Sequence, residues 1–214
     1  MNKSLLSAVL LLSSFTIHTA SASDSGFYLG GAIGSSDIDD DGLVSKSNSA
    51  QTATFEAKDN AYRIMAGYKF NRIASIEAQY TDYGDVVAHN AKVNFARSYN
   101  FSWAPKVISL SANLGYTFDN GLRPFGVVGL SSIDLDSKDG RYSASQIKSD
   151  ADFGARVGFG LEYTPPKAPA FTMRLGYEAD AFDAEINEAR LGTNKTYKKT
   201  VILDSFYLGA MYTF

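Results

Sequence analysis

The last ten residues of the chain, 205–214, alternate between two kinds of side chain. The apolar phase holds Phe206, Leu208, Ala210, Tyr212 and Phe214. The other phase holds Ser205, Tyr207, Gly209, Met211 and Thr213. A period of two predicts a β-strand whose two faces meet different environments. Because the chain stops on an aromatic residue of the apolar phase, we expect this face to meet lipid, with Phe214 at the membrane–water boundary.

Alternation of this kind recurs along the chain and predicts eight strands in all. The earlier ones cover residues 26–34, 61–70, 74–81, 108–118, 122–133, 153–163 and 171–180. Turn-forming residues make short connections at 71–72, 119–121 and 164–169. Longer polar connections occupy residues 35–60, 83–105, 133–149 and 182–199. Strands of about ten residues with short and long connections in turn predict an all-β, eight-stranded, antiparallel up-and-down transmembrane barrel. We expect the last strand to close it against the first, with the short turns in the periplasm.

The composition agrees with such a barrel and excludes several other classes. Hydrophobic residues make up 45% of the 214 residues and the mean hydropathy is −0.14, as expected when half of each strand faces a polar interior. The net charge of −3 argues against nucleic acid as a partner. The chain has no cysteine, which excludes disulfides, thiolate metal sites and an acylated lipoprotein.

The first 22 residues have the pattern of a secretory signal peptide. Lys3 supplies the positive charge, residues 5–17 the apolar centre, and Ala20-Ser21-Ala22 the small-residue cleavage site. The apolar run is too short to cross a bilayer as a helix, which takes about 20 residues, and no later run is long enough. We therefore expect cleavage after Ala22 and a mature barrel domain over residues 23–214. A secreted soluble protein is the alternative.

Two arguments place the polar phase of the strands inside the barrel. A soluble lipocalin-like barrel would have the apolar phase inside instead. Here the polar phase is rich in Gly, Ser and Thr, which suits a crowded interior. Its few charges have mixed signs and suggest pairing: Arg63, Glu77, Arg156, Glu162, Arg174 and Glu178. On the apolar phase, aromatic residues next to the short turns predict an interface girdle of Phe27, Phe70, Phe118, Phe125, Tyr163, Phe171 and Phe214.

Segments spread over the whole mature chain resemble a known family. They are GFYLGGAIG at 26–34, IEAQYTDYG at 76–84, LGYTF at 114–118, GFGLEY at 158–163 and YLGAMYTF at 207–214. The chain resembles the small outer-membrane barrels typified by the transmembrane domain of outer-membrane protein A and the opacity-type surface proteins. This resemblance implies a place in the outer membrane of a diderm bacterium, among its lipids and lipopolysaccharide. It also implies an assembly signal at Phe214, with Tyr212 and Leu208, that the outer-membrane assembly machinery reads. The chain ends at the barrel without a peptidoglycan-binding domain, so no tether to the cell wall is implied.

The interior charges form the first candidate site. A symmetric turn at 164–169 would place Arg156 opposite Glu178 and Glu162 opposite Thr172, and Arg63 would lie diagonal to Glu77. One interpretation is an ion-pair network that plugs a lumen just wide enough for side chains. The other is a gate, in which the charges re-pair and open a narrow conduit.

The sequence gives little support for a metal site or a catalytic site. Residues 37–42, DIDDDG, resemble the start of a calcium loop, but the twelfth position is Asn48 rather than the bidentate Glu. We predict a solvated acidic loop, and neither a metal nor a cofactor. The mature chain has one histidine, His89, and nearby serines include Ser98, Ser102 and Ser109. The sequence His89-Asn90-Ala91 lacks the His-x-Ser pair of lipid A deacylase barrels, and a lone loop histidine lacks an orienting partner. We expect no enzyme.

The long connections are the remaining candidates for function, since binding sites often lie on loops of a rigid scaffold. The first is acidic, at Asp37, Asp39, Asp40 and Asp41, and the fourth ends with Lys195, Lys198 and Lys199. The second carries Phe95, Tyr99, Phe101 and Trp103, either a contact surface or the upper part of the girdle. These features predict a structural or surface-interaction role of the adhesion type, carried by four extracellular loops. A narrow gated channel is the alternative.

Overall fold

A computed structural model describes residues 25–39, 53–57, 60–90, 101–135, 145–147, 152–190 and 193–214. The signal peptide predicted at residues 1–22 lies outside the described residues. All elements of the described part are β-strands. The barrel strands are β1 (Gly26–Gly34), β4 (Ala61–Lys69), β5 (Ala74–Asp82), β8 (Lys106–Gly115), β9 (Leu122–Asp134), β11 (Asp152–Tyr163), β12 (Phe171–Arg190) and β13 (Thr193–Thr213).

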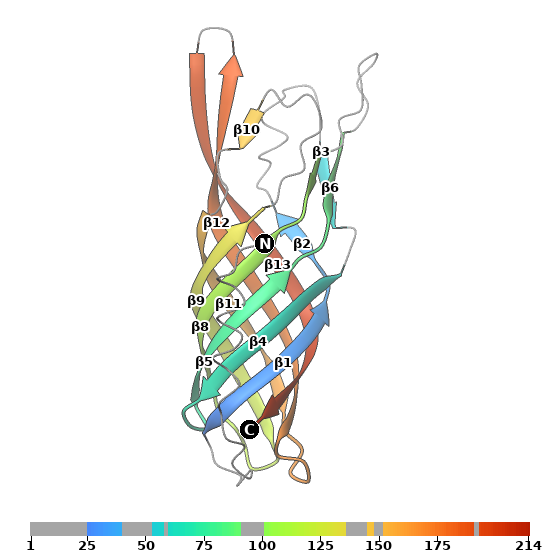
Figure 1. Cartoon of the computed structure of the whole chain (residues 1–214), viewed down its shortest axis with the longest axis vertical. Coiled ribbons are helices and arrows are strands. Elements are labelled where there is room, and N and C mark those ends of the chain that lie inside the picture. The colour runs from blue at the N-terminus through green and yellow to red at the C-terminus, as the bar shows by residue number, and fades with distance from the viewer. Residues whose placement is uncertain are drawn as a thin grey trace, which may run out of the picture.

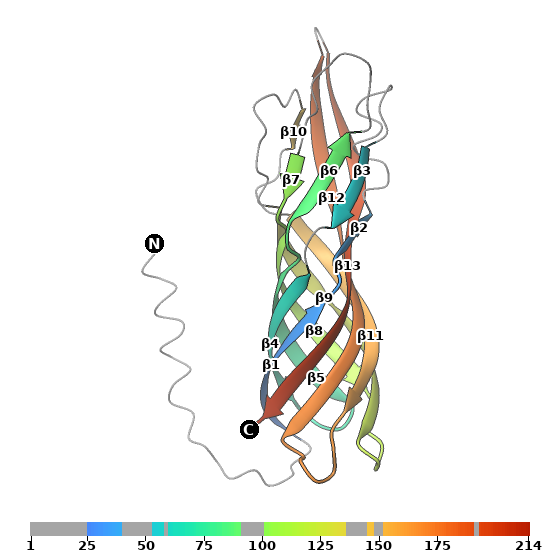
Figure 2. The same ribbon diagram turned by 90° about the vertical axis from the view of Figure 1, so that its right-hand side faces the viewer.

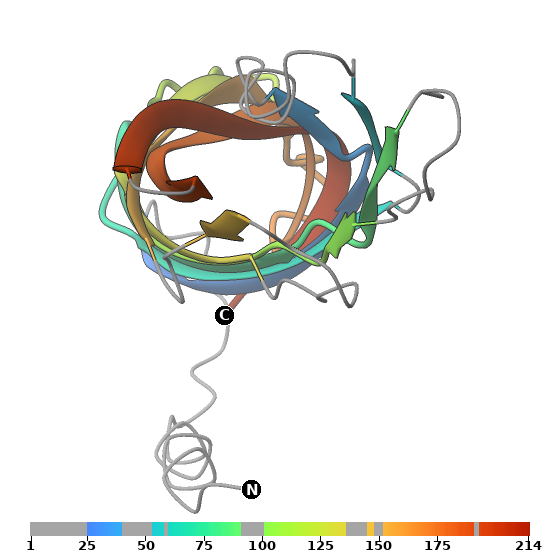
Figure 3. The same ribbon diagram turned by 90° about the horizontal axis from the view of Figure 1, so that it is seen from above.

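Each barrel strand pairs antiparallel with the next, and β13 returns to pair with β1. The closed barrel is seen from the side in Figures 1 and 2 and along its axis in Figure 3. The predicted eight-stranded up-and-down fold is confirmed, including closure by the last strand. Closure runs from Tyr28 opposite Thr213 to Gly34 opposite Tyr207. A Cβ at Gly30 would lie 2.7 Å from the carbonyl oxygen of Ala210, so the seam needs glycine there.

The two faces of the sheet have the predicted polarity. Large apolar side chains such as Leu130 and Phe206 are exposed on the outer surface, whereas charged side chains such as Glu77 and Arg156 are fully buried inside. This is the reverse of a water-soluble barrel and matches a wall that faces hydrocarbon. No helix of the described residues is long and apolar enough to cross a membrane.

The three short turns and the C-terminus lie at one end of the barrel, here called the turn end (Figure 1). The Asn-Gly turn behaves as predicted, with Gly121 at a φ of 83°. The described parts of the long connections lie at the opposite end, here called the loop end, and contain strands that sequence patterns did not reveal. β2 (Asp37–Asp39) pairs with β13, and β10 (Ser145–Ile147) pairs with β12. β3 (Ala53–Ala57), β6 (Val86–Asn90) and β7 (Phe101–Trp103) form a separate sheet.

The fourth long connection is largely strand rather than loop, so the prediction for residues 182–199 is wrong. β12 and β13 continue past the rim as one hairpin, visible at the top of Figure 1. Their register places Glu185 opposite Lys198 and Glu188 opposite Lys195. A polar, charged sequence suggests a loop, but opposite charges at facing positions are also what favours strand pairing.

Candidate functional site: the filled lumen

Four arginines and four carboxylates gather inside the barrel, and their formal charges cancel. They are Arg63, Arg123, Arg156 and Arg174 with Glu77, Glu162, Glu178 and Asp180. Each of these residues is at most 3% exposed. The structure brings together all the predicted lumen charges and adds Arg123 and Asp180, which were not among them. Both additions occupy the inward phase of their strands, and that phase was the signal that could have identified them.

The part of the network nearer the loop end is centred on Arg156. Its Nε and Nη2 donate to the two carboxylate oxygens of Asp180 at 2.9 and 2.6 Å, which is a bidentate pair. Its Nη1 lies 3.3 Å from Glu178 Oε2. The same Glu178 oxygen accepts a hydrogen bond from Arg63 Nη1 at 2.7 Å. Two buried carboxylates therefore hold two buried guanidinium groups.

The part nearer the turn end is centred on Arg174. Its Nη1 and Nη2 donate to Glu77 Oε1 and Oε2 at 2.9 and 2.7 Å. Arg174 Nη2 also lies 2.7 Å from Glu162 Oε1, and Arg123 Nη1 lies 3.0 Å from Glu162 Oε2. The ring of Phe125 supports this part, with its centroid 4.9 Å from the guanidinium carbon of Arg174.

Uncharged side chains join the two parts into one network. Gln79 Nε2 donates to Glu77 Oε1 at 2.6 Å, and Gln79 Oε1 accepts from Arg156 Nη1 at 2.8 Å. The hydroxyls of Tyr28 and Tyr207 donate to Glu77 and Glu178, each at 2.5 Å. The two tyrosines were not predicted as members of the network, because the sequence does not distinguish a tyrosine that binds a buried carboxylate from any other aromatic residue of a strand. The network satisfies its charges by contacts that span the full width of the lumen.

The predicted pairing partners need correction. Arg156 faces Asp180 rather than Glu178, and Glu162 faces Arg174 rather than Thr172. The register differs from the predicted one by two residues because the connection contains two successive turns rather than one symmetric turn. Ala168 N donates to Pro165 O in the first turn, and Phe171 N, at the start of β12, donates to Ala168 O in the second. A shift of two keeps every side chain on its face.

The predicted neighbour of Arg63 also needs correction. Arg63 lies opposite Thr81, so Glu77 is four residues away along β5 and is not its diagonal neighbour. Arg63 instead reaches across the lumen to Glu178.

Of the seven residues predicted as an interface girdle, all except Phe125 lie on the outer surface. Phe27, Phe70, Phe118, Tyr163, Phe171 and Phe214 are exposed outward near the turn end, whereas Phe125 is 5% exposed and lies inside. Leu122 and Pro124 take the outward positions of β9 and turn Phe125 into the lumen. The residues predicted as an assembly signal, Leu208, Tyr212 and Phe214, share the outer surface, and the Tyr212 and Phe214 ring centroids are 5.2 Å apart.

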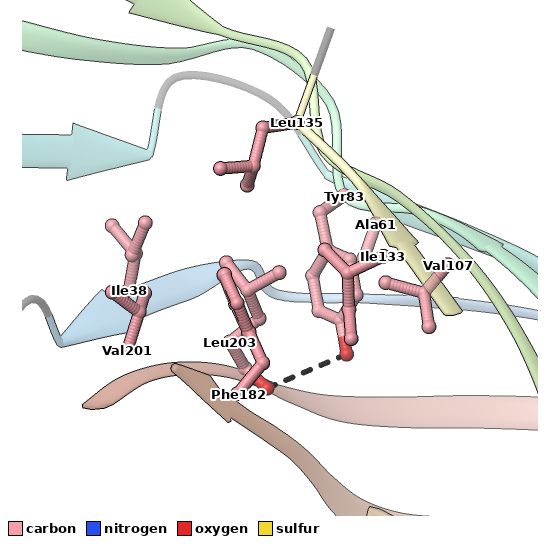
Figure 4. Packing of buried hydrophobic residues seen from close by; sticks show 9 residues of the cluster. All are labelled: Ile38, Ala61, Tyr83, Val107, Ile133, Leu135, Phe182, Val201 and Leu203. Atoms are coloured by element: carbon pink, nitrogen blue, oxygen red, sulfur yellow. Dashed lines mark hydrogen bonds between the residues drawn. The ribbon is translucent and has the colours of Figure 1, made fainter. Parts of the chain in front are cut away.

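Above the network, towards the loop end, the lumen holds a cluster of buried side chains that are mostly apolar. This apolar cap consists of Ile38, Ala61, Tyr83, Val107, Ile133, Leu135, Phe182, Val201 and Leu203 (Figure 4). Tyr83 joins cap and network, because its hydroxyl lies 2.9 Å from Asp180 Oδ2 and 3.5 Å from Leu203 O. The lumen is therefore filled by ion pairs in its middle and by hydrocarbon at its mouth.

Some buried polar atoms of the described lumen have no hydrogen-bond partner. They include the hydroxyl oxygens of Thr81, Ser109 and Ser131 and the Nη2 atom of Arg63. The three hydroxyls lie on β5, β8 and β9, and Ser109 faces Ser131 in the register. These small hydroxyl side chains lie on the same strands as two members of the ion network, Glu77 on β5 and Arg123 on β9.

The other predicted sites are not assembled in the described part of the chain. Of the calcium-like segment, Asp37 and Asp39 lie in β2, while residues 40–42 and Asn48 fall outside the described residues. The described residues contain no cluster of metal-ligating side chains. His89 is in β6 of the separate sheet, whereas Ser109 lies in the lumen wall. Phe101 and Trp103 are in β7, and Ser102 lies between them. Phe95, Ser98 and Tyr99 are also outside the described residues.

Comparison with solved structures finds the same fold in outer-membrane proteins. OprG of Pseudomonas aeruginosa has a TM-score of 0.57 at 16% identity, covering 90% of this chain and 96% of its own. AlkL, solved in lipid bilayers, has a TM-score of 0.58 at 16% identity, covering 94% and 96%. Neisserial surface protein A has a TM-score of 0.50 at 21% identity, covering 92% and 100%. At these identities the likeness concerns the fold alone.

Sequence comparison gives the family. No curated protein sequence matches this chain. The family described as "Outer membrane protein beta-barrel domain" matches residues 7–214, nearly the whole sequence. Together with the polarity of the barrel and the solved outer-membrane relatives, this match places the protein in the bacterial outer membrane. The chain belongs to the outer membrane protein β-barrel domain family.

Proposed function

We propose that this protein is a non-enzymatic barrel with a closed lumen that acts through its loop end, in envelope structure or in surface interaction of the adhesion type. The observation that supports the proposal is that two clusters of buried side chains, the charge network and the apolar cap, occupy successive levels of the lumen. We further propose that residues 1–22 are removed on export.

The contacts of the network favour a plug over a narrow gated channel. To open a path, Arg156 would have to leave both Asp180 and Glu178, while Arg63 would lose its own bond to Glu178. Breaking a buried pair leaves uncompensated charges and costs about 3–5 kcal/mol for one lost partner. The apolar cap would still separate the network from the solvent at the loop end.

The loop end offers strands that project from the barrel as a platform for binding. Residues 183–190 of β12 and 193–200 of β13 extend beyond the last pairing of β12 with β11, at Phe182. Eight residues of strand correspond to about 26 Å. The hairpin and the β3–β6–β7 sheet rise together above the rim (Figure 2). Binding often resides on such projections from a stable scaffold.

The outer surface supports the proposed partners. A band of exposed apolar residues fits membrane lipids and lipopolysaccharide. We propose that Phe214, with Tyr212 and Leu208, is the signal for the outer-membrane assembly machinery. The net charge of −3 gives no support for nucleic acid as a partner.

A cell-binding assay tests the surface role. Cells that produce the full chain are compared with cells whose protein carries a short Asn-Gly turn in place of residues 184–199. We expect the shortened protein to keep its heat-modifiable gel migration and the cells to lose attachment to a host-cell layer. Equal attachment by both strains, with equal amounts of folded protein at the surface, would contradict a role of the hairpin in adhesion.

A liposome-swelling assay tests the channel alternative. Vesicles containing the purified barrel are diluted into small sugars, with protein-free vesicles as the control. We expect equal swelling rates because the lumen is filled. Faster swelling of the protein-containing vesicles would favour the channel.

A further inference from the structure

The short strand β2 continues the pairing of β1 along the edge of β13. Gly34 faces Tyr207, Asp37 faces Asp204 and Asp39 faces Ile202, all in a single register. Between the two strands, Ser35 N donates to Phe206 O at 2.8 Å. β2 therefore extends the barrel seam beyond the end of β1.

The two faces of β2 meet very different surroundings. Ile38 points inward and belongs to the apolar cap, at 8% exposure. Asp37 and Asp39 are exposed on the outside, and Asp37 lies directly opposite Asp204. Like charges at facing positions of an antiparallel pair destabilise the pairing. The seam at β2 thus combines a favourable inner contact with an unfavourable outer one.

Carboxylates dominate the surroundings of Asp204. The titratable or charged groups that act on it are Asp37 and Asp39 of β2 and Tyr177 of β12. Asp204 lies two residues beyond Phe206 on the outer face of β13, in the row where the outward residue of the partner strand is Asp37 rather than an apolar residue such as Ile33, and so beyond the apolar band of the seam. Burial raises the pKa of Asp204 above its usual range, and the neighbouring Asp37 raises the pKa further, against the hydrogen bond from Tyr177.

We propose that β2 is an acid-stabilised latch that fastens the first long connection to the base of the β12–β13 hairpin. A carboxyl group with a raised pKa binds its proton more tightly in the paired state, so pairing is favoured as pH falls and weakened as pH rises through that pKa. Protonation of Asp204 removes its repulsion of Asp37, and Ile38 stays in the cap. This device rests on the seam alone and does not depend on what the loop end binds.

Amide hydrogen exchange on the full mature chain, refolded in detergent micelles, tests the latch. Protection factors for the amides of Asp37, Asp39 and Asp204 are measured at about pH 5 and about pH 8, with the intrinsic exchange rates divided out. We expect about two- to fivefold higher protection at the lower pH, the range set by one facing like-charge pair. Equal protection at the two pH values would overturn the proposal.

Two neutral variants identify the responsible pair. Asp204→Asn should make protection of β2 independent of pH and as high at about pH 8 as the wild type shows at about pH 5. Asp37→Asn, which keeps an acceptor for the Ile38 amide, should do the same and serves if the first variant fails to fold. The matched control Asp134→Asn, at the rim on β9, should keep the wild-type dependence. Persistence of the dependence in a folded Asp204→Asn or Asp37→Asn protein would overturn the proposal.

Discussion

The charge network and the apolar cap fill the same lumen by opposite means. The network joins eight charged side chains through short, directed hydrogen bonds, and two of its arginine–carboxylate pairs are bidentate. The cap packs mostly hydrocarbon, with Tyr83 as its polar link to the network. A directed network fails when one partner is lost, because the other keeps a buried charge, whereas a packed cluster responds mainly to volume. The two regions should therefore react very differently to equivalent substitutions.

The largest effect is expected in the network. Glu178→Ala leaves Arg63 without its carboxylate and removes one acceptor from Arg156. We expect the free energy of unfolding to fall by about 3–5 kcal/mol. Equilibrium unfolding in urea measures this free energy, with heat-modifiable gel migration as the readout of folded protein. As a control, Asp119→Ala removes the exposed contact of 3.8 Å to Arg72 in a turn and should leave the midpoint unchanged. Equal midpoints for Glu178→Ala and the control would contradict the network.

A smaller effect is expected in the cap. Leu203→Ala removes a fully buried side chain and should cost about 2–4 kcal/mol, through lost burial and a partly relaxed cavity. Leu203→Met keeps the volume and should cost less than about 1.5 kcal/mol. The same unfolding assay compares the two. If Met were as costly as Ala, the cap would depend on shape more than on volume, and its contrast with the network would weaken.

A still smaller effect on stability is expected at Tyr83, which links the two regions. Tyr83→Phe keeps the ring in the cap but deletes the hydroxyl that donates to Asp180. Since Asp180 retains both bonds from Arg156, we expect a cost of about 1–3 kcal/mol, the value of one hydrogen bond to a charged group. A double-mutant cycle with Leu203→Ala measures the coupling. Strictly additive costs would mean that cap and network fold independently.

The smallest effect is expected at the hydroxyls without partners. Ser109→Ala and Ser131→Ala delete groups that make no hydrogen bond in the described lumen. We expect the free energy of unfolding to change by no more than about 0.5 kcal/mol in either direction, because an unsatisfied buried group is removed. Unfolding midpoints well below that of the wild type would show that these hydroxyls belong to the network after all.

Strand positions and faces follow from the sequence because a period of two survives in almost every barrel strand. The interior charges follow for the same reason, since phase alone assigns a residue such as Arg174 to the lumen. Partners do not follow from phase. The register of β11 and β12 depends on the asymmetric 164–169 turn, and Arg63 pairs across the lumen with a strand far away in the sequence.

The wrong predictions for individual residues and segments also have physical causes. Phe125 breaks the rule that aromatics face lipid, because Pro124 occupies the outward position and the ring supports Arg174 inside. The cap was missed since an apolar residue such as Leu203 is unremarkable in a strand until the pairing shows that it points inward. The long hairpin was missed because its charges resemble a solvated loop.

Single-channel recording in planar lipid bilayers tests the closed lumen most directly. The wild-type barrel, inserted from detergent into a protein-free bilayer, should produce no discrete conductance steps under applied voltage, because the network and the cap both block the axis. Reproducible steps from the wild-type protein, absent from detergent alone, would contradict the account.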